Sequence, residues 1–482
     1  MQHQSFSLEF TVRFTARSLL LITYAATFSL LLALNVSAED AILNQKDAGV
    51  LQTLKTQALN SDLSFEILES LTTEVGARLA GTPADQKAIR WAVQKMQELS
   101  FDKIWTEDVN IPAWDRGTLE VAISEPYQHR LTGLSLGGSV GTEGRALNAD
   151  VIEFADLKEL ESAEPNSLKG KIAYISNRMV RHTEGRGYGV AVPARGVGAN
   201  IAASKGANAL IIRSIGTDDH RFAHTGGMNY ADDAVRIPAI AISNPDADLL
   251  SRVLMRGKAA VKFSSTAKRY DSKMRKTANV IGEITGSDAP DEIVALGAHL
   301  DSWDVGTGAM DDGLGVAITM AAASMIGKSE VTPKRTIRVI LYGAEEIGFY
   351  GTKQYMIDHA DSVDQHMIGA EWDFGLGRIF ELRPGVGENS LAAIQTLGSH
   401  LLDLGVLMGK GNDAQAQSDM SLLSKAGMPA VNFMPDGSRY FDYHHTDNDT
   451  LDKISPDDLK QNTAVYTVFA WFAAQSGVDF RR

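Results

Sequence analysis

Short apolar runs alternate with longer helical patterns through the second half of the chain. Four such runs span residues 293–298, 335–344, 366–372 and 430–434, and each has the length and apolar character of a buried strand. Residues 313–326, between the first two runs, are small and apolar enough to form a packed helix. The alternation predicts an α/β fold, with a doubly wound, mixed sheet flanked by helices on both faces.

The region before residue 119 predicts elements of the same kind. The pattern is helical over residues 47–72, and Thr82 followed by Pro83 is typical of a helix start with Pro at the first helical position. Residues 109–114 predict an edge strand interrupted by Pro112. We therefore expect this region to join the same α/β domain.

Between these two regions the chain has a different character. Short β runs with turn signals dominate residues 119–268, and one Ala-rich helix is predicted over residues 196–205. We therefore expect a β-rich insert over residues 119–268, within an α/β domain formed by residues 39–118 and 269–482.

The N-terminus has the pattern of a secretory signal over residues 1–38. Arg13 and Arg17 precede an apolar run over residues 18–34, and small residues at positions 36–38 offer a cleavage site. The run is shorter than the roughly 20 residues that a membrane-spanning helix needs. We therefore expect cleavage and a secreted or periplasmic protein, with an uncleaved anchor as the alternative.

Composition narrows the partners and the available chemistry. The chain has 46 basic and 60 acidic residues, a net charge of −14. This balance argues against nucleic-acid partners and, once the signal is removed, against anionic membrane surfaces. There is no Cys, so disulfides are excluded and any metal ligand must be a nitrogen or an oxygen atom.

Each of the four predicted strands leads into residues that can bind metal. The candidates are His299, Asp301, Asp304, Asp311 and Asp312 after the first run, Glu345 and Glu346 after the second, Asp373 after the third, and His444 and His445 after the fourth. Open α/β folds place their sites at the carboxyl ends of the strands. Two adjacent carboxylates at a strand end are costly without cations. The pattern therefore predicts a metal centre.

The motifs HLDSWDVGTGAMDDG, AEEIG and HHTDNDT, together with Asp373, resemble those of the M28 family of co-catalytic zinc peptidases. The resemblance runs from about Leu63 to the C-terminus and implies the zinc exopeptidase fold with two Zn²⁺ ions. Carried over residue by residue, it makes His299 and Asp373 ligands of one ion. Glu346 and His445 become ligands of the other, and Asp311 bridges the two.

The resemblance also implies roles around the metals. Glu345 falls on the general base, which takes a proton from the attacking water and passes it to the leaving amine. Asp301 falls where a carboxylate accepts the free imidazole N–H of His299. His445 is chosen over His444 as the ligand because it stands just before Thr446 and four residues before Asp449. A cis peptide between Asp311 and Asp312 is a further expectation.

Substrate contacts are expected from other parts of the chain. The insert resembles a protease-associated domain, which narrows access to the site, and its His224 is the residue there that we expect to touch substrate. Ser418 and Asp419 are expected near the substrate's terminus, with ordinary helix capping as the alternative. His444 is a fourth candidate contact.

The resulting hypothesis is a secreted two-zinc exopeptidase whose substrates are dipeptides or short peptides. Both a carboxypeptidase and an aminopeptidase branch of the family use these metals, so the end of the substrate that is recognised stays open. A cationic pocket would indicate recognition of a carboxylate, and the candidates are Arg378, Arg383 and Arg439. A metal-dead, receptor-like binding protein is the alternative of another class. The resemblance also suggests a homodimer.

Overall fold

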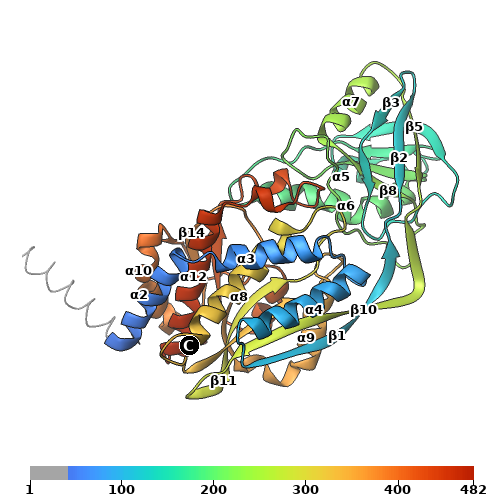
Figure 1. Cartoon of the computed structure of the whole chain (residues 1–482). Coiled ribbons are helices and arrows are strands. Elements are labelled where there is room, and N and C mark those ends of the chain that lie inside the picture. The colour runs from blue at the N-terminus through green and yellow to red at the C-terminus, as the bar shows by residue number, and fades with distance from the viewer. Residues whose placement is uncertain (1–41) are drawn as a thin grey trace, which may run out of the picture.

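The computed structural model describes residues 42–482 and contains two lobes, each built on an eight-stranded sheet (Figure 1). The segment predicted to be a signal, residues 1–38, lies outside the described residues. The first sheet has the strand order β1-β10-β12-β11-β13-β16-β14-β15. Its strands are β1 (Lys103–Asp115), β10 (Lys268–Ile284), β11 (Ala289–His299), β12 (Arg335–Tyr342), β13 (His366–Glu371), β14 (Ile379–Gly385), β15 (Leu407–Met408) and β16 (Ala430–Pro435).

The four runs predicted as buried strands form the centre of this sheet. β12, β11, β13 and β16 lie side by side and run parallel, whereas β10 and β14 flank them in the antiparallel sense. The register pairs His299 with Tyr342, and Gly297 with Glu371. The carboxyl ends of neighbouring parallel strands therefore meet at one edge, which is the geometry a shared site requires.

Helices cover both faces of the first sheet, as the sequence predicted. One face carries α2 (Gln45–Leu59), α3 (Leu63–Ser70), α4 (Pro83–Glu98), α8 (Leu314–Gly327), α10 (Leu391–Leu401) and α12 (Pro456–Gln475). The other face carries α9 (Tyr350–Asp358) and α11 (Ser421–Lys425). Thr82 caps α4 by accepting from Asp85 N, and Pro83 is its first residue. The helical pattern at 47–72 is divided into α2 and α3.

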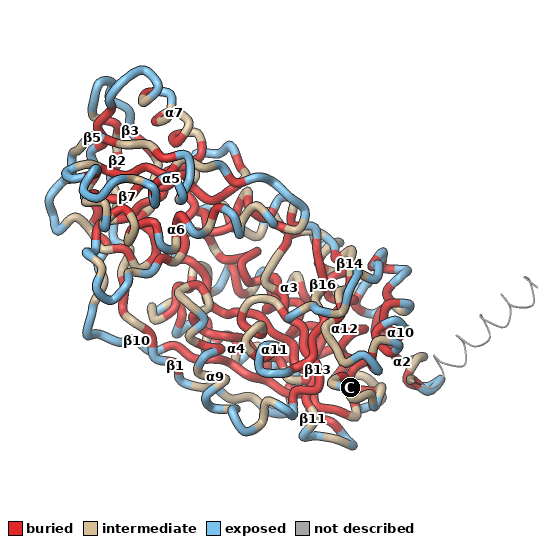
Figure 2. Tube along the Cα trace, turned by 180° about the vertical axis from the view of Figure 1, so that it is seen from behind, coloured by how far each residue is buried: buried red, intermediate tan, exposed pale blue. Residues whose placement is uncertain are grey.

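The helix α8 is the centre of the core. It is buried along nearly its whole length because its small side chains allow close packing against β11, β12, α3 and α12. Among the described residues, Ala309–Gly327 is the one helical segment with the length and composition of a membrane span, and it is entirely buried within the protein. Figure 2 shows the same burial along the central strands and α12.

The second lobe lies at one end of the molecule, reached along the long antiparallel pair β1 and β10 (Figure 1). Its sheet has the order β3-β2-β9-β5-β6-β7-β8-β4. The strands are β2 (Leu119–Glu125), β3 (His129–Leu131), β4 (Gly133–Ser135), β5 (Leu147–Phe154), β6 (Ile172–Ile175), β7 (Ala209–Arg213), β8 (Ala239–Ile242) and β9 (Ala260–Ser265), and the helices are α5 (Leu157–Ser162), α6 (Arg186–Ser204) and α7 (Asn244–Leu254).

One helix of this lobe begins ten residues earlier than its pattern predicts. The prediction covered residues 196–205, whereas α6 runs over Arg186–Ser204 and contains Pro193. Gly and Pro lower helix propensity, so the local pattern favoured a later start. Burial of Ala191 and Ala194 against the lobe's core outweighs that cost.

Candidate metal centre

Four strand ends bring the predicted ligands together at one edge of the first sheet. His299 is the last residue of β11, and Glu346 follows β12 by four residues. Asp373 follows β13 by two residues, and His445 lies beyond the end of β16. Asp311 lies in the turn η2 (Ala309–Gly313), directly before α8, and its peptide bond to Asp312 is cis, as expected.

The two carboxylate oxygens of Asp311 face two separate groups of side chains. Its Oδ1 lies 3.1 Å from Nε2 of His299, and that nitrogen lies 3.3 Å from Oδ1 of Asp373. Its Oδ2 lies 3.2 Å from Nε2 of His445, and that nitrogen lies 3.0 Å from Oε2 of Glu346. Asp311 is thus placed between two pairs, each consisting of an imidazole and a carboxylate.

The chemistry of this cluster fits a pair of zinc ions. Zinc binds imidazole nitrogen and carboxylate oxygen at about 2.0–2.2 Å, so ligand atoms about 3–3.5 Å apart can share one ion. The contact of Asp311 Oδ2 with His445 lacks hydrogen-bond geometry. This oxygen and Oε1 of Glu346 are both buried, and neither has a hydrogen-bond partner in the described part of the chain. Buried carboxylate oxygens without partners are costly unless a cation binds them.

Both imidazoles are oriented so that Nε2 faces the carboxylates. Nδ1 of His299 lies 3.0 Å from the main-chain carbonyl of Asp301, and Nδ1 of His445 lies 3.2 Å from that of Thr225. A carbonyl can only accept, so each Nδ1 carries the proton and donates it. Nε2 is then left unprotonated in each neutral ring, which is the tautomer that binds metal.

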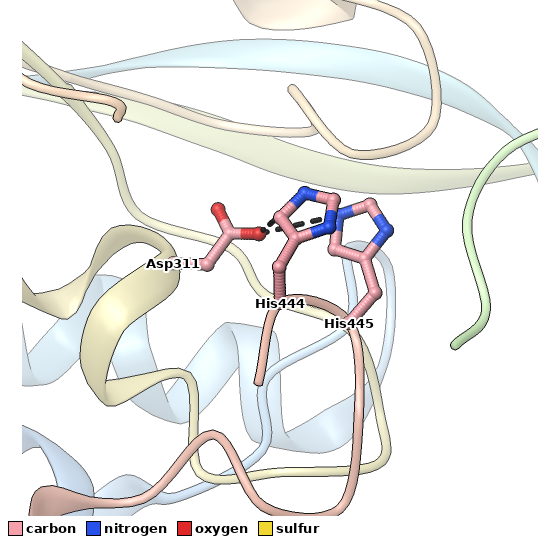
Figure 3. Close-up of side chains that lie close together, drawn as sticks. All are labelled: Asp311, His444 and His445. Atoms are coloured by element: carbon pink, nitrogen blue, oxygen red, sulfur yellow. Dashed lines mark ion pairs between the residues drawn. The ribbon is translucent and has the colours of Figure 1, made fainter. Parts of the chain in front are cut away.

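His444 lies beside His445 but has fewer carboxylate contacts. The two rings stack with their centroids 3.5 Å apart, and both reach Asp311, at 3.4 Å from His444 and 3.2 Å from His445 (Figure 3). Only His445 also contacts Glu346. Burial, followed by repulsion from His445, holds the pKa of His444 well below its usual range, so this ring is neutral.

The electrostatics of the cluster favour a bound cation. Burial lowers the pKa of His445, but Glu346 and Asp311 outweigh it and raise that pKa well above its usual value. Burial also raises the pKa of Glu346 to about 7, against the opposing effect of His445. The negative charge that holds a proton on His445 equally attracts a divalent cation, which displaces that proton on binding.

Glu345 is separated from its neighbour Glu346 and faces the cavity. Its Oε1 accepts a hydrogen bond of 2.8 Å from Oγ of Ser418, and both residues line the cavity. Burial, and next the charge of Asp373, raise the pKa of Glu345 well above its usual range. A carboxylate that tends to hold a proton is suited to taking one from water.

Asp301 supports the site through different atoms than the sequence predicted. Its carboxylate lies 3.7 Å from Nδ1 of His299, beyond hydrogen-bond distance, and its main-chain carbonyl accepts from that nitrogen instead. The carboxylate accepts from the backbone N–H of Glu345 at 3.0 Å. The loop after β11 turns back on itself, so the carbonyl and not the side chain reaches the ring.

Two residues for which the sequence predicted no role of their own hold the loops of the centre. The guanidinium of Arg78 is fully buried and donates to the main-chain carbonyls of Leu300 (2.5 Å), Thr307 (2.8 Å) and Gly308 (2.9 Å). The carboxylate of Asp449 accepts from the backbone N–H groups of Met310 and Asp311. Arg78 lies in the loop between Val75 and Pro83, where the sequence has no motif, whereas Asp449 belongs to the motif HHTDNDT.

The second lobe contributes to the centre through a loop at His224 and Thr225. Besides the contact of Thr225 with His445, Nδ1 of His224 donates to the main-chain carbonyl of His444 at 2.7 Å. Nε2 of His224 lies 2.6 Å from Oδ2 of Asp218. His224 is buried and is not among the residues that line the cavity, so the structure places this expected substrate contact behind the two histidines.

A cavity of about 490 Å³ opens onto the cluster between the two lobes. The first lobe lines it with Asp311, Glu345, Glu346, Asp373, Ser418, His444 and His445 among others, and the second lobe contributes residues such as Tyr188, Arg195 and Met228. Asp419 is fully buried beneath the cavity and does not line it.

The three arginines named as candidates for a cationic pocket lie outside the cavity lining. Arg383 pairs with Glu381 and Glu184, Arg439 donates to the hydroxyl of Tyr443, and Arg378 is exposed. These arginines are near the predicted ligands in the sequence, but their side chains do not reach the cavity. The cationic residues that do line the cavity are Arg195 and Arg269.

Comparison with known proteins identifies the family. The model of peptidase family M28 matches residues 279–470. Human carboxypeptidase Q is 33% identical over 416 residues, which cover 85% of this chain and 85% of that protein. The crystal structure of a peptidase M28 precursor from Shewanella amazonensis is 45% identical and superposes with a TM-score of 0.88, covering 90% of this chain and 98% of that one.

A zinc aminopeptidase from Bacillus subtilis has the same fold, with a TM-score of 0.62 at 21% identity over 87% of this chain and 97% of its own. The span matched by the family model contains His299, Asp311, Glu346 and His445. The chain therefore belongs to peptidase family M28 and is a zinc metallopeptidase of that family.

Proposed function

We propose that the chain is an exported two-zinc exopeptidase that hydrolyses dipeptides or short peptides. The observation that carries this proposal is the position of Asp311. One of its oxygens contacts His299, which lies beside Asp373, and the other contacts His445, which lies beside Glu346. A carboxylate shared in this way is suited to bridging two cations. The predicted signal at residues 1–38 is the basis for export.

In this proposal His299 and Asp373 would hold one zinc, Glu346 and His445 would hold the other, and Asp311 would be shared between them. Zinc in such a site supplies Lewis acidity, which polarises a carbonyl oxygen and lowers the pKa of water from 15.7 toward about 7. The main-chain carbonyls of Asp301 and Thr225 fix the two rings in the ligating tautomer.

Glu345 is proposed as the proton carrier. The peptide C–N bond breaks as water adds to the carbonyl carbon, and the proton removed from water goes to the leaving amine. Glu345 faces the cavity beside Asp373, and the hydroxyl of Ser418 orients its carboxylate through Oε1. Its raised pKa suits a group that takes up and then releases a proton during one turnover.

The size of the cavity favours short substrates. Its volume of about 490 Å³ is within the range of sites for small ligands, about 300–1,000 Å³. The second lobe forms one wall through residues such as Gly137, Met228 and Asn229, and that wall limits how far a chain can extend from the metal centre. This agrees with the name of one relative, carboxypeptidase Q, and with an exopeptidase rather than an endopeptidase.

Zinc content and hydrolysis, measured on one preparation, test the proposal. We expect about two zinc ions per chain by elemental analysis, and hydrolysis of a dipeptide panel that a chelator abolishes and added zinc restores. Protein with bound zinc that cleaves no peptide, or active protein whose rate is independent of chelation, would contradict it. Protein that neither binds zinc nor cleaves peptide would instead favour the metal-dead, receptor-like alternative.

The loop of the second lobe gives a further prediction. In a His224→Ala variant the carbonyl of His444 loses its donor, so the backbone that carries His445 is held less firmly. We expect the apparent affinity for zinc to fall by about 10- to 100-fold, the usual effect of removing a group that orients a ligand. Competition with a metallochromic chelator measures this without reference to activity. His129→Ala, an exposed histidine in the same lobe, is the control; equal zinc affinities in the two variants would refute this role of His224.

A further inference from the structure

The ionisable residues that line the cavity are unevenly distributed. Its carboxylates belong to Asp311, Glu345, Glu346 and Asp373, and all four are already placed as metal ligands or as the proton carrier. No carboxylate in the lining is left to receive a substrate ammonium group. The cationic side chains in the lining, Arg195 and Arg269, come from outside the metal cluster.

Arg195 lies on α6 with its guanidinium buried and without a counterion. Nη2 donates to the hydroxyl of Tyr188 at 2.6 Å, and Nη1 donates to the carbonyl of Thr225 at 3.2 Å. Nε is buried without a hydrogen-bond partner, and no salt bridge to Arg195 occurs within residues 42–482. A buried charge is normally paired, so an anion from outside the protein is the group this site lacks.

Arg269 is in a different situation. Its Nε is likewise buried without a hydrogen-bond partner, but it lies 3.7 Å from Oδ1 of Asp271, so a protein carboxylate already offsets its charge. Arg269 is also partly exposed to solvent, which lowers the cost of leaving it without a ligand. Of the two arginines, Arg195 is therefore the one expected to gain most from a bound anion.

The position of the guanidinium of Arg195 is fixed by its surroundings. Its centre lies 5.5 Å from the ring centroid of Tyr188, which permits a cation–π contact. On another side it lies against Gly226, where an added Cβ would come within 2.2 Å of Nη1. The φ of Gly226, +138°, also disfavours any other residue. A group held in this way is already oriented for a planar ligand such as a carboxylate.

The distance from Arg195 to the metal centre corresponds to a short leaving group. Nη1 lies 3.5 Å from Nδ1 of His445, whose opposite nitrogen contacts Asp311 and Glu346. Nδ1 donates its proton to Thr225, so it cannot also accept from Arg195. One imidazole ring therefore separates the guanidinium from the cluster. One residue of extended backbone, about 3.5 Å long, would span a gap of similar size.

We propose that Arg195 binds a carboxylate of the residue on the leaving side of the scissile bond. This assignment rests on the proposed function and deepens it, because it makes a free C-terminal carboxylate a condition for efficient cleavage. Arg195 would be a specificity-determining residue, supplied by the second lobe to a site whose metals are bound by the first. It would explain why the cavity needs both lobes.

Three dipeptide substrates test the proposal with the zinc-loaded full-length protein. They are alanyl-leucine, its C-terminal amide, and the α-amide of alanyl-glutamate, whose only carboxylate is on the side chain. Wild type, Arg195→Met, Arg195→Lys and Arg269→Met are compared by kcat/KM, with the zinc content of each variant measured. We expect wild type to prefer the free acid over its amide by about 100-fold, the effect of a charge-assisted hydrogen-bonded pair.

Arg195→Met should lose about 100-fold on the free acid, mainly through KM, and less than about threefold on the amide, so that the preference disappears. Arg195→Lys should retain part of the preference because it keeps the charge but not the planar fork. Arg269→Met should keep the wild-type ratio. The α-amide of alanyl-glutamate should be cleaved as slowly as the amide of alanyl-leucine, and cleavage at the rate of the free acid would overturn the requirement for a C-terminal carboxylate.

Hydrolysis of the amide serves as the internal check on folding and metal loading in each variant. An unchanged acid-to-amide ratio in both Arg195 variants would overturn the assignment, as would a loss of the ratio in Arg269→Met. A wild type that cleaves the amide as fast as the acid would overturn it while leaving the peptidase proposal intact. Absence of cleavage of all three substrates by zinc-loaded wild type would overturn the proposed function, and this assignment with it.

Discussion

A Glu345→Gln variant is expected to bind zinc as wild type does and to lose about 10²–10⁴-fold in kcat, the usual contribution of a general base. Glutamine keeps the shape of the side chain and can still accept from Ser418, but it cannot take a proton from water. Glu345 contacts neither imidazole of the cluster, so the metal ligands are not disturbed. Steady-state kinetics and elemental analysis on one preparation measure both effects.

The matched control for this experiment is Glu388→Gln, an exposed glutamate remote from the cavity lining, which should leave both kcat and zinc content unchanged. A Glu345→Gln variant with near-normal turnover would remove the proposed role. So would a variant that loses zinc together with activity, because Glu345 would then act on metal binding and not on proton transfer.

An Asp311→Asn variant is expected to have the second large effect, on metal content as well as on rate. An amide offers one oxygen ligand and an NH₂ group that cannot bind metal, so one of the two ions loses its bridge. We expect zinc to fall from about two ions per chain to one or fewer. The kcat/KM should fall on the order of 10³-fold or more, since several kcal/mol of transition-state stabilisation depend on the metals.

Asp304→Asn provides the comparison, because Asp304 lies in the same loop but pairs with Arg116 and does not line the cavity. It should retain zinc and lose less than about threefold in kcat/KM. If Asp311→Asn kept two ions and comparable activity, Asp311 would not be the bridge, and the assignment of the other ligands to two separate ions would lose its basis.

The central strands and the ligand candidates were predictable because each depends on a short stretch of sequence. The runs that became β11, β12, β13 and β16 are mostly apolar, as is typical of strands buried on both faces. Each run is followed within a few residues by a predicted ligand or by the predicted base, except β16, where the loop that leads to His445 is longer. Parallel strands place such residues at one edge, so convergence follows from the topology.

The contacts around the ligands were not predictable, because they join elements far apart in the chain. The carbonyl of Thr225 reaches His445 across 220 residues, and Nε of Arg78 reaches the carbonyl of Leu300 across 222. Every residue has a main-chain carbonyl, so the residue type does not indicate which carbonyl accepts a hydrogen bond. The expectation that the carboxylate of Asp301 would orient His299 was wrong for the same reason, because the acceptor is the backbone of that residue.

The residues facing the substrate were also poorly indicated by sequence. His224 has the residue type of a substrate contact, but its burial beside Asp218 gives it a supporting position. Arg195 lies in α6, and the Gly and Pro residues of this helix kept its N-terminal half from being predicted. The position of Arg195 in the cavity lining was therefore not predicted either. Charge in a pocket depends on which face of a helix turns inward, and that is decided by packing between the two lobes.

The central claim is that Asp311 bridges two zinc ions, and anomalous diffraction at the zinc absorption edge from crystals of zinc-loaded protein tests it most directly. We predict two anomalous peaks about 3.5–4 Å apart. One should lie between His299 and Asp373 and the other between Glu346 and His445, with an oxygen of Asp311 bound at each. A single peak, or two peaks of which Asp311 binds only one, would contradict the account.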